Sequence, residues 1–142
     1  MSIYECKREM WKIFRKYHYL NMDIFQASKC FVAMIDNIPV SFIAVLHFPH
    51  SKVKNFKRVH RLVVLPDYQG IGIGNRLLEF IGKKYISSGY RYIITTSTPA
   101  LLQYFQNSKL WICGKFGINT PHSISISKAG YGRITTSWEM KL

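Results

Sequence analysis

The order of hydrophobic and polar positions predicts helices and strands that alternate along the chain. In residues 1–20, apolar side chains recur at helical spacing with basic residues between them, so we expect an amphipathic helix with a basic outer face. In residues 29–48, two runs rich in β-branched and aromatic side chains flank the turn sequence Asp36-Asn37-Ile38-Pro39. This arrangement predicts a β-hairpin.

The rest of the chain continues the alternation. Residues 57–65 end in the apolar run L-V-V-L and stop at Pro66, which has no N–H for a strand ladder, so a central strand is expected there. Apolar positions recur at helical spacing in residues 74–88, before Gly89, a residue typical of helix ends. Further elements are expected as strands at 90–96, 110–113 and 133–140, a helix at 99–107, and a long loop or hairpin tip at 114–130. The pattern predicts a mixed α/β fold.

Composition agrees with one folded domain spanning residues 1–142. The chain is 48% hydrophobic and 15% aromatic, which is enough to bury roughly two thirds of its unfolded surface. The longest apolar run, residues 30–35, is far shorter than the roughly 18 residues of a membrane span, and residues 1–16 are too charged for a signal peptide. We therefore expect a cytoplasmic protein with no membrane partner.

Three cysteines are scattered along the chain without a C-x-x-C motif. Cys6, Cys30 and Cys113 have apolar or helical neighbours and no ligand-like cluster around them. We expect buried, reduced thiols and no metal site.

The charge balance is strongly basic. Lys and Arg number 20 against 7 Asp and Glu, for a net charge of +13. Such a surplus usually indicates polyanionic partners, here nucleic acid, an acidic protein or a phosphorylated cofactor. The basic clusters at residues 7–16 and 52–61 are also compatible with simple solvated faces.

A glycine-rich segment, Y-Q-G-I-G-I-G-N-R at residues 68–76, lies between the central strand and its helix. Glycines at alternate positions let the backbone approach a ligand closely, and the helix N-terminus attracts phosphate. A dinucleotide-binding turn requires G-x-G-x-x-G and a later acidic residue, and a nucleotide-triphosphate loop ends in G-K-[ST]. Both are excluded, because the spacing here is G-x-G-x-G and the end is Gly74-Asn75-Arg76.

The run L-V-V-L-P-D-Y-Q-G-I-G-I-G-N-R-L-L resembles the acyl-coenzyme A binding motif of the GNAT acetyltransferase superfamily, [QR]-x-x-G-x-[GA], with Gln69, Gly72 and Gly74 at its defined positions. The resemblance implies a central mixed, mostly antiparallel sheet flanked by helices, with acetyl-CoA as cofactor. It implies that the coenzyme diphosphate is held by the amides of Gly70, Ile71, Gly72, Ile73 and Gly74. It also implies pairing of pantetheine with the strand backbone at Val63, Val64 and Leu65, and phosphate contacts from Asn75 and Arg76.

The resemblance also indicates catalytic candidates. The segment A-L-L-Q-Y matches the family's A-x-x-x-Y helix, which implies that Tyr104 protonates the leaving thiolate; the alternative is an ordinary helix aromatic. Many relatives have a carboxylate on the motif strand, where this chain has His60. With an ordinary pKa of about 6.5, His60 suits a general base at neutral pH, and the alternative is a hydrogen-bonded strand residue. His47 and His50 flank a region that often contributes to the acceptor site in relatives; the alternative is that they are solvated histidines at a strand end and in a loop.

These features predict an acyl-CoA-dependent N-acetyltransferase that works by direct attack in a ternary complex. The positive charge favours an acceptor amine that is anionic or carried on an anionic polymer. Three stretches are also similar to a phage-type and ATPase-fused branch, some of whose members modify DNA bases: F-R-K-Y-H-Y-L-N, H-R-L-V-V-L-P-D-Y-Q-G and T-T-S-T-P. This similarity implies a nucleic-acid base as acceptor. The rival hypothesis is a non-catalytic GNAT-like module that binds nucleic acid or protein.

Overall fold

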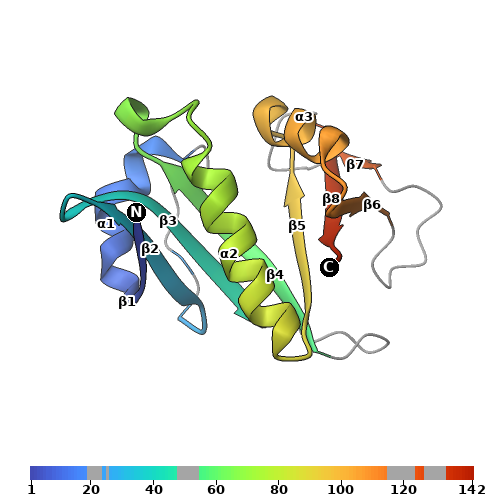
Figure 1. Ribbon diagram of the computed structural model, residues 1–142, viewed down its shortest axis with the longest axis horizontal. Helices are drawn as coiled ribbons and strands as arrows, with labels where there is room; N and C mark the ends of the chain where they lie inside the picture. The colour runs from blue at the N-terminus through green and yellow to red at the C-terminus, as the bar shows by residue number, and fades with distance from the viewer. Residues whose placement is uncertain (19–23, 25, 48–54, 115–123, 127–133) are drawn as a thin grey trace.

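A single eight-stranded sheet organises the fold in the computed structural model, which describes residues 1–18, 24, 26–47, 55–114, 124–126 and 134–142 (Figure 1). The strands are β1 (Ser2–Cys6), β2 (Lys29–Ile35), β3 (Ile38–His47), β4 (Phe56–Val64), β5 (Arg91–Thr96), β6 (Trp111–Cys113), β7 (Ile124–Ile126) and β8 (Ile134–Met140). Their order is β1-β2-β3-β4-β5-β8-β6, with β7 also paired to β8. Among the strands that the structure describes, only β4 and β5 pair in parallel. The predicted mixed, mostly antiparallel sheet is confirmed.

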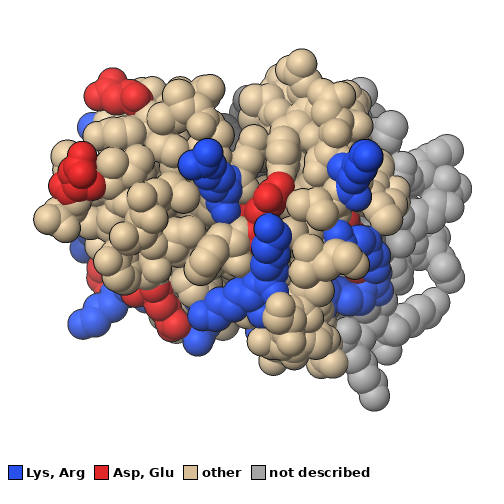
Figure 2. Space-filling view, viewed as in Figure 1, with Lys and Arg blue, Asp and Glu red and all other residues tan. Residues whose placement is uncertain are grey.

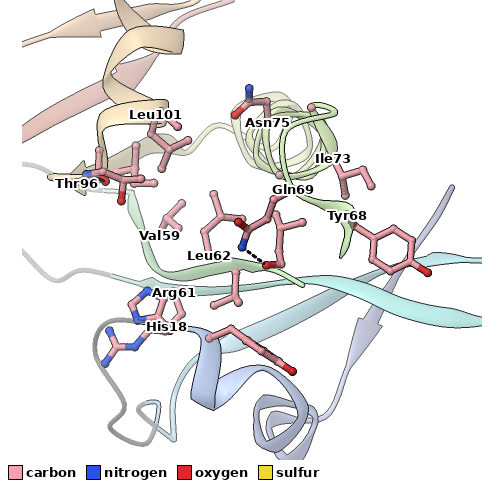
Figure 3. Close-up of a pocket in the computed structure, with 18 of the residues that line it drawn as sticks. His18, Val59, Arg61, Leu62, Tyr68, Gln69, Ile73, Asn75, Thr96 and Leu101 are labelled. Atoms are coloured by element: carbon pink, nitrogen blue, oxygen red, sulfur yellow. Dashed lines mark hydrogen bonds between the residues drawn. The ribbon is translucent and has the colours of Figure 1, made fainter. Parts of the chain in front are cut away.

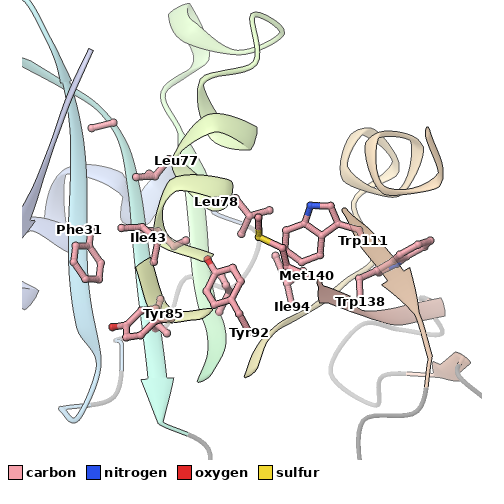
Figure 4. Close-up of a cluster of buried hydrophobic side chains, with 14 of the residues drawn as sticks. Phe31, Ile43, Leu77, Leu78, Tyr85, Tyr92, Ile94, Trp111, Trp138 and Met140 are labelled. Atoms are coloured by element: carbon pink, nitrogen blue, oxygen red, sulfur yellow. The ribbon is translucent and has the colours of Figure 1, made fainter. Parts of the chain in front are cut away.

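Helices cover both faces of this sheet. The helical elements are η1 (Arg8–Met10), α1 (Trp11–Phe14), η2 (Arg15–Tyr17), η3 (Pro66–Tyr68), α2 (Ile73–Ser87) and α3 (Pro99–Asn107). Side chains of α2 and α3 share one buried cluster with the sheet, and Phe105 is the member from α3. Figure 4 shows Leu77 of α2 and Tyr92 of β5 in this cluster. The segment η1-α1-η2 packs on the opposite face, in a second cluster that contains Phe42 and Val63. No helix among the described residues is long and apolar enough to cross a membrane.

The predicted hairpin is formed by β2 and β3. Asp36 and Asn37 have φ angles of 50° and 62°, which are the left-handed conformations of a two-residue hairpin turn. Ile35 pairs with Ile38 directly across it. Local turn chemistry is therefore enough to determine this part of the sheet.

The N-terminal helix prediction is wrong for residues 2–6. These residues form β1, an edge strand that pairs antiparallel with β2 from Ser2↔Met34 to Cys6↔Cys30. The α-helical part is only Trp11–Phe14, where Trp11 and Phe14 each lie 5.5 Å, between ring centroids, from Phe42. The sheet edge offers backbone hydrogen bonds that an isolated short helix cannot match. Residue 20, the last position of the predicted helix, lies outside the described residues.

The other predicted elements agree with the structure within one or two residues. The central strand is β4, the following helix is α2, and the helix predicted at 99–107 is α3. Within the predicted loop at 114–130 the structure describes Gly114 and the short strand β7. Residues 52–54 of the basic cluster at 52–61 lie outside the described part of the chain.

The three cysteines differ in burial. Cys30 is buried and Cys6, directly opposite it, is partly buried, whereas Cys113 is exposed. The prediction of buried thiols is therefore wrong for Cys113. It lies on β6, the last strand of the sheet order, where the neighbouring Ile112 is exposed as well.

Two irregularities in β4 open the sheet. Its parallel pairing with β5 runs from Phe56↔Arg91 to Val59↔Ile94 and goes no further, so the two strands diverge beyond that pair. On the other side, Val45 pairs with Val59 while Ala44 pairs with Arg61. His60 is thus the extra residue of a β-bulge, which redirects side chains at the point where the strands separate.

Candidate active site

A cavity of about 560 Å³ lies where β4 and β5 diverge. Its walls come from β4, β5, the segment between β4 and α2, the start of α3, and Tyr17 and His18 after α1. Figure 3 shows Arg61 and His18 on one side of the cavity and Gln69, Ile73 and Asn75 on another. The cavity therefore joins the glycine-rich segment to a region the sequence did not single out.

The glycine loop, residues 69–74, forms one wall. Gly70 and Gly72 have φ angles of 82° and 84°, a left-handed conformation that L side chains rarely adopt. A Cβ added at either would meet nothing within 4 Å, so these backbones face open space. The Gln69 side chain donates from Nε2 to the Val64 carbonyl at 2.9 Å, which ties the loop to the end of β4.

The N-terminus of α2 points its amides at the same space. The first helical hydrogen bond runs from Arg76 N to Gly72 O at 3.0 Å, so the amides of Ile73, Gly74 and Asn75 have no partner within the helix. A Cβ on Gly74 would lie 2.9 Å from Val64 Cγ2, and only glycine lets the helix approach β4 this closely. Free amides and the dipole of a 15-residue helix suit a phosphate group.

We call Tyr17, His18, His60 and Arg61 the acceptor half of the cavity. Arg61 is only 5% exposed. Its Nη1 donates to the His60 carbonyl at 2.9 Å and lies 3.2 Å from His60 Nδ1. Burial first, and then the positive charges of Arg61, Arg58 and His18, lower the pKa of His60 to about 4. No Asp or Glu occurs among the described residues that line the cavity.

Most of the predicted cofactor residues lie together in the cavity wall. These are Val63, Val64, Gln69, Gly70, Gly72, Ile73, Gly74 and Asn75. Leu65, Ile71 and Arg76 are not among the lining residues, although they adjoin them in the chain. His60, the predicted base, also lines the cavity.

The remaining predicted residues lie elsewhere. Tyr104 does not line the cavity, but Ala100, one helical turn before it, does. The Tyr104 hydroxyl is buried and has no hydrogen-bond partner in the described part of the chain. His47 pairs with Lys57 near the start of β4, at the other end of the strand, and stacks edge-on to Tyr90. His50 lies outside the described residues.

Tyr17, His18 and Arg61 of the acceptor half were not predicted as site residues from the sequence, and neither was a polar wall on β5. Thr95, Thr96 and Thr98 line the cavity, and the Thr96 hydroxyl accepts a hydrogen bond from the Thr98 amide at 3.1 Å. The T-T-S-T run at a strand end was a usable signal for the threonines. No sequence signal indicated Arg61. The alternation of side chains along a regular strand does not reveal a bulge, and the position of Arg61 depends on the bulge at His60.

A comparison with protein families decides the identity of this fold. A model described as an acetyltransferase (GNAT) domain matches residues 26–108, which is more than half of the chain and runs from before β2 to the end of α3. The chain belongs to the GNAT acetyltransferase family. The resemblance based on the glycine loop is confirmed, since the family match includes that loop.

Solved structures share the GNAT fold over nearly the whole chain. A Bacillus subtilis acetyltransferase in complex with CoA has a TM-score of 0.72 and 14% identity, covering 99% of this chain and 97% of its own. A ribosomal-protein-alanine N-acetyltransferase from Brucella melitensis has a TM-score of 0.72 and 11% identity, with both chains covered to 100%. An IAA acetyltransferase from Bacillus cereus has a TM-score of 0.70 and 16% identity, with both covered to 99%. At these identities the likeness is one of fold. A comparison with curated proteins finds no match.

Proposed function

We propose that this GNAT protein transfers an acetyl group from acetyl-CoA to an amine while both substrates are bound. The observation that carries the proposal is the glycine loop, whose left-handed Gly70 and Gly72 and free α2 amides face one cavity. Structural relatives were solved with CoA or with acetyl-CoA, which supports the choice of donor. Bound acetyl-CoA supplies an activated thioester, and the protein must orient it and manage protons around it.

The donor half of the cavity fits the coenzyme. Amides of the glycine loop and of the first turn of α2 are donors for the diphosphate, and Asn75 adds a polar side chain. Beyond Val59 the β4 backbone is no longer paired with β5, so this side of the strand is open to the amides of pantetheine, while the Val63 and Val64 carbonyls already accept from Ser41 Oγ and Gln69 Nε2. Each part of the cofactor therefore has a partner of suitable chemistry.

Tyr104 remains our proposed general acid. It follows Ala100 by one helical turn, so both side chains leave the same face of α3. Its hydroxyl is buried and bonded to no described atom, so no described residue holds its proton, although Tyr104 itself does not line the cavity. A correctly placed acid of this kind contributes roughly 10²–10⁴-fold to a rate.

The acceptor half favours an amine on an anionic molecule. Arg61, Arg58 and His18 each lower the pKa of His60 through their charge, and no described residue of the cavity wall is acidic. In such a site a phosphate or carboxylate on the acceptor gains electrostatic stabilisation, whereas a polyamine is repelled.

A basic face next to this opening supports an acceptor on a nucleic-acid strand. Arg8, Lys12 and Lys16 all belong to the short η1-α1-η2 segment, and the two lysines are exposed. Lys16 Nζ lies 4.9 Å from the ring centroid of Tyr17, a partly exposed aromatic that lines the cavity. Basic grooves with aromatic platforms are typical of single-strand binding. On the α2 face, by contrast, basic side chains are interspersed with acidic and neutral surface (Figure 2).

Calorimetry with acetyl-CoA tests the donor site. Gly72→Glu places a carboxylate at the loop and is expected to abolish binding by repelling the diphosphate. Gly89→Glu is the matched control, because Gly89 has the same left-handed conformation, with φ at 88° and open space around it, but lies outside the cavity. Equal binding by both variants, or no binding by the wild type, would contradict the donor site.

Thiol release from acetyl-CoA tests the acceptor. Phosphoethanolamine and ethanolamine share one amine and differ in the phosphate, so the proposal expects the phosphorylated compound to react at least tenfold faster. Equal rates would reject an anionic acceptor. Acetyl-CoA binding without thiol release for any amine or oligonucleotide would favour the non-catalytic module.

Fluorescence anisotropy of a labelled single-stranded oligonucleotide tests whether the protein binds a nucleic-acid strand through these basic residues. Lys12→Gln/Lys16→Gln is expected to weaken binding and flatten its salt dependence, since each lost phosphate contact lowers the slope. Lys83→Gln/Lys84→Gln on α2 removes the same charge elsewhere and is the control. Equal effects of the two double variants would reject the basic face as a binding track.

A further inference from the structure

The contact between Arg61 and His60 determines which imidazole nitrogen can carry a proton. Arg61 Nη1 lies 3.2 Å from His60 Nδ1 in hydrogen-bond geometry. A guanidinium is always protonated and only donates, so Nδ1 must be the acceptor. In the neutral ring the proton is then on Nε2, and the one basic lone pair faces a cation.

The same arginine also fixes the orientation of the ring. Nη1 donates to the His60 carbonyl at 2.9 Å, so the guanidinium spans the backbone and the side chain of a single residue. Arg61 is 5% exposed and follows the bulged position, where the backbone conformation sets both side chains. The pair therefore acts as one unit in the cavity wall, with little freedom for the imidazole to turn over.

The charges around His60 disfavour an additional proton. Arg61 comes from the same strand, Arg58 from two positions before His60 on that strand, and His18 from the segment after α1, and all three shift the pKa downward together with burial. The pKa of about 4 means that the ring is neutral at physiological pH. A neutral imidazole with a fixed N–H is a hydrogen-bond donor, a role that other enzymes obtain by lowering a histidine pKa.

We propose that Arg61 is a positioning residue that holds the His60 imidazole neutral with its proton on Nε2, so that His60 serves the reaction as a hydrogen-bond donor and not as the general base. Nε2 is buried in the wall of the cavity that His60 lines, so its target is a substrate oxygen that gains negative charge during transfer and that enters the cavity deeply enough to reach this N–H. The donor role rests on the proposed acetyl transfer, whereas the tautomer is a property of the protein alone.

Nitrogen-15 NMR of histidine-labelled protein, without any ligand, tests the tautomer. The wild type is expected to show Nε2 protonated and Nδ1 unprotonated from pH 5.5 to 8. In Arg61→Met the His60 pKa should rise toward its ordinary value of about 6.5, with a mixture of tautomers. Arg58→Met is the matched control, because it removes a nearby charge without the hydrogen bond, and it should leave the tautomer unchanged.

A wild-type ring with the proton on Nδ1 overturns the proposal whether or not the variants fold. The proposal is also overturned if the His60 ring in the Arg61→Met variant shows the same pKa and the same tautomer as in the wild type, provided that the variant has a native circular dichroism spectrum. These spectra are independent of acetyl-CoA binding, so failure here is distinct from failure of the proposed function.

Thiol release from acetyl-CoA with phosphoethanolamine then tests the donor role. His60→Gln keeps an N–H donor but has no basic nitrogen, so its kcat is expected to stay within about threefold of wild type, while His60→Leu loses at least tenfold. An equal loss of activity in His60→Gln and His60→Leu would contradict the donor role and would instead support His60 as the general base. If the wild type does not release thiol with this amine, the proposed acceptor fails and the NMR result still decides the tautomer.

Discussion

Arg91 and Glu139 join the parallel and antiparallel parts of the sheet through two hydrogen bonds. Arg91 Nε donates to Oε1 at 2.6 Å and a terminal nitrogen of the same guanidinium donates to Oε2 at 2.9 Å. Lys141 lies 3.1 Å from the same carboxylate, whose side chain is 6% exposed. Burial alone would raise the pKa of Glu139, but the hydrogen bonds and charges of Arg91 and Lys141 lower it overall.

This pair predicts a specific loss of stability in acid. Because the folded-state pKa of Glu139 is depressed, its contribution is present above the unfolded pKa of about 4.3 and is lost as the pH falls through the folded value. Glu139→Gln is expected to lower the free energy of unfolding by about 2 kcal/mol at pH 7. That difference should shrink below about pH 4, as measured by urea denaturation.

Glu5→Gln is the control for that experiment. Glu5 pairs with Lys29 at 3.3 Å, but the two side chains are 53% and 61% exposed. An exposed ion pair of this kind contributes about 0–1 kcal/mol. An equal loss of stability in Glu5→Gln and Glu139→Gln would contradict the prediction that the buried ion pair contributes more to stability than the exposed one.

Tyr104 and Tyr92 offer a matched test of the proposed general acid. Both hydroxyls are buried without a hydrogen-bond partner among the described residues. Replacing either tyrosine by Phe removes an unsatisfied polar group, so neither variant should lose stability. Only Tyr104→Phe is expected to slow thiol release, by at least tenfold. Unchanged turnover in Tyr104→Phe would make Tyr104 a packing residue.

Gly82 predicts a packing defect far from the cavity. A Cβ at this position would lie 2.5 Å from Met140 Sδ and 2.8 Å from the ring of the fully buried Tyr92. Gly82→Ala is expected to lower the free energy of unfolding by roughly 1–3 kcal/mol through overpacking, although alanine favours helix. Lys83→Ala, an exposed neighbour on α2, should change it by less than about 0.5 kcal/mol. Similar thermal midpoints for the two variants would contradict the overpacking, because they would mean that Met140 and Tyr92 move aside at no cost in stability.

Maleimide labelling at pH 7.5 should distinguish the three cysteines. Burial raises the pKa of Cys6 to about 12 and that of Cys30 to about 11, so their thiolate fractions are small. Cys113 is exposed and should react first. Mass spectrometry of native protein is expected to show one rapid modification, which Cys113→Ser removes. Rapid labelling of Cys6 or Cys30 would contradict the packing of β1 on β2.

Elements with strong local signals were predictable. The β2–β3 hairpin depends on two turn residues that accept a left-handed backbone, and α2 depends on its own apolar periodicity. The glycine loop was identified because each glycine has a local reason, namely a positive φ at Gly70 and Gly72 and a close approach at Gly74. The N-terminal strand was not predictable, because its helical spacing of apolar residues competes with a pairing partner that lies more than twenty positions away.

By itself the sequence determined the phosphate-binding half of the site, since a loop and the helix it opens are contiguous in the chain. Only the tertiary structure decided the acceptor half. Tyr17 and His18 come from the far face of the sheet, and Arg61 reaches His60 through a bulge that exists only because β4 pairs with β3 out of register. The low pKa of His60 follows from that assembly, because burial and the neighbouring Arg61, Arg58 and His18 act together on it in the folded protein. Local chemistry can be read along a chain, but electrostatics depends on distances that folding creates.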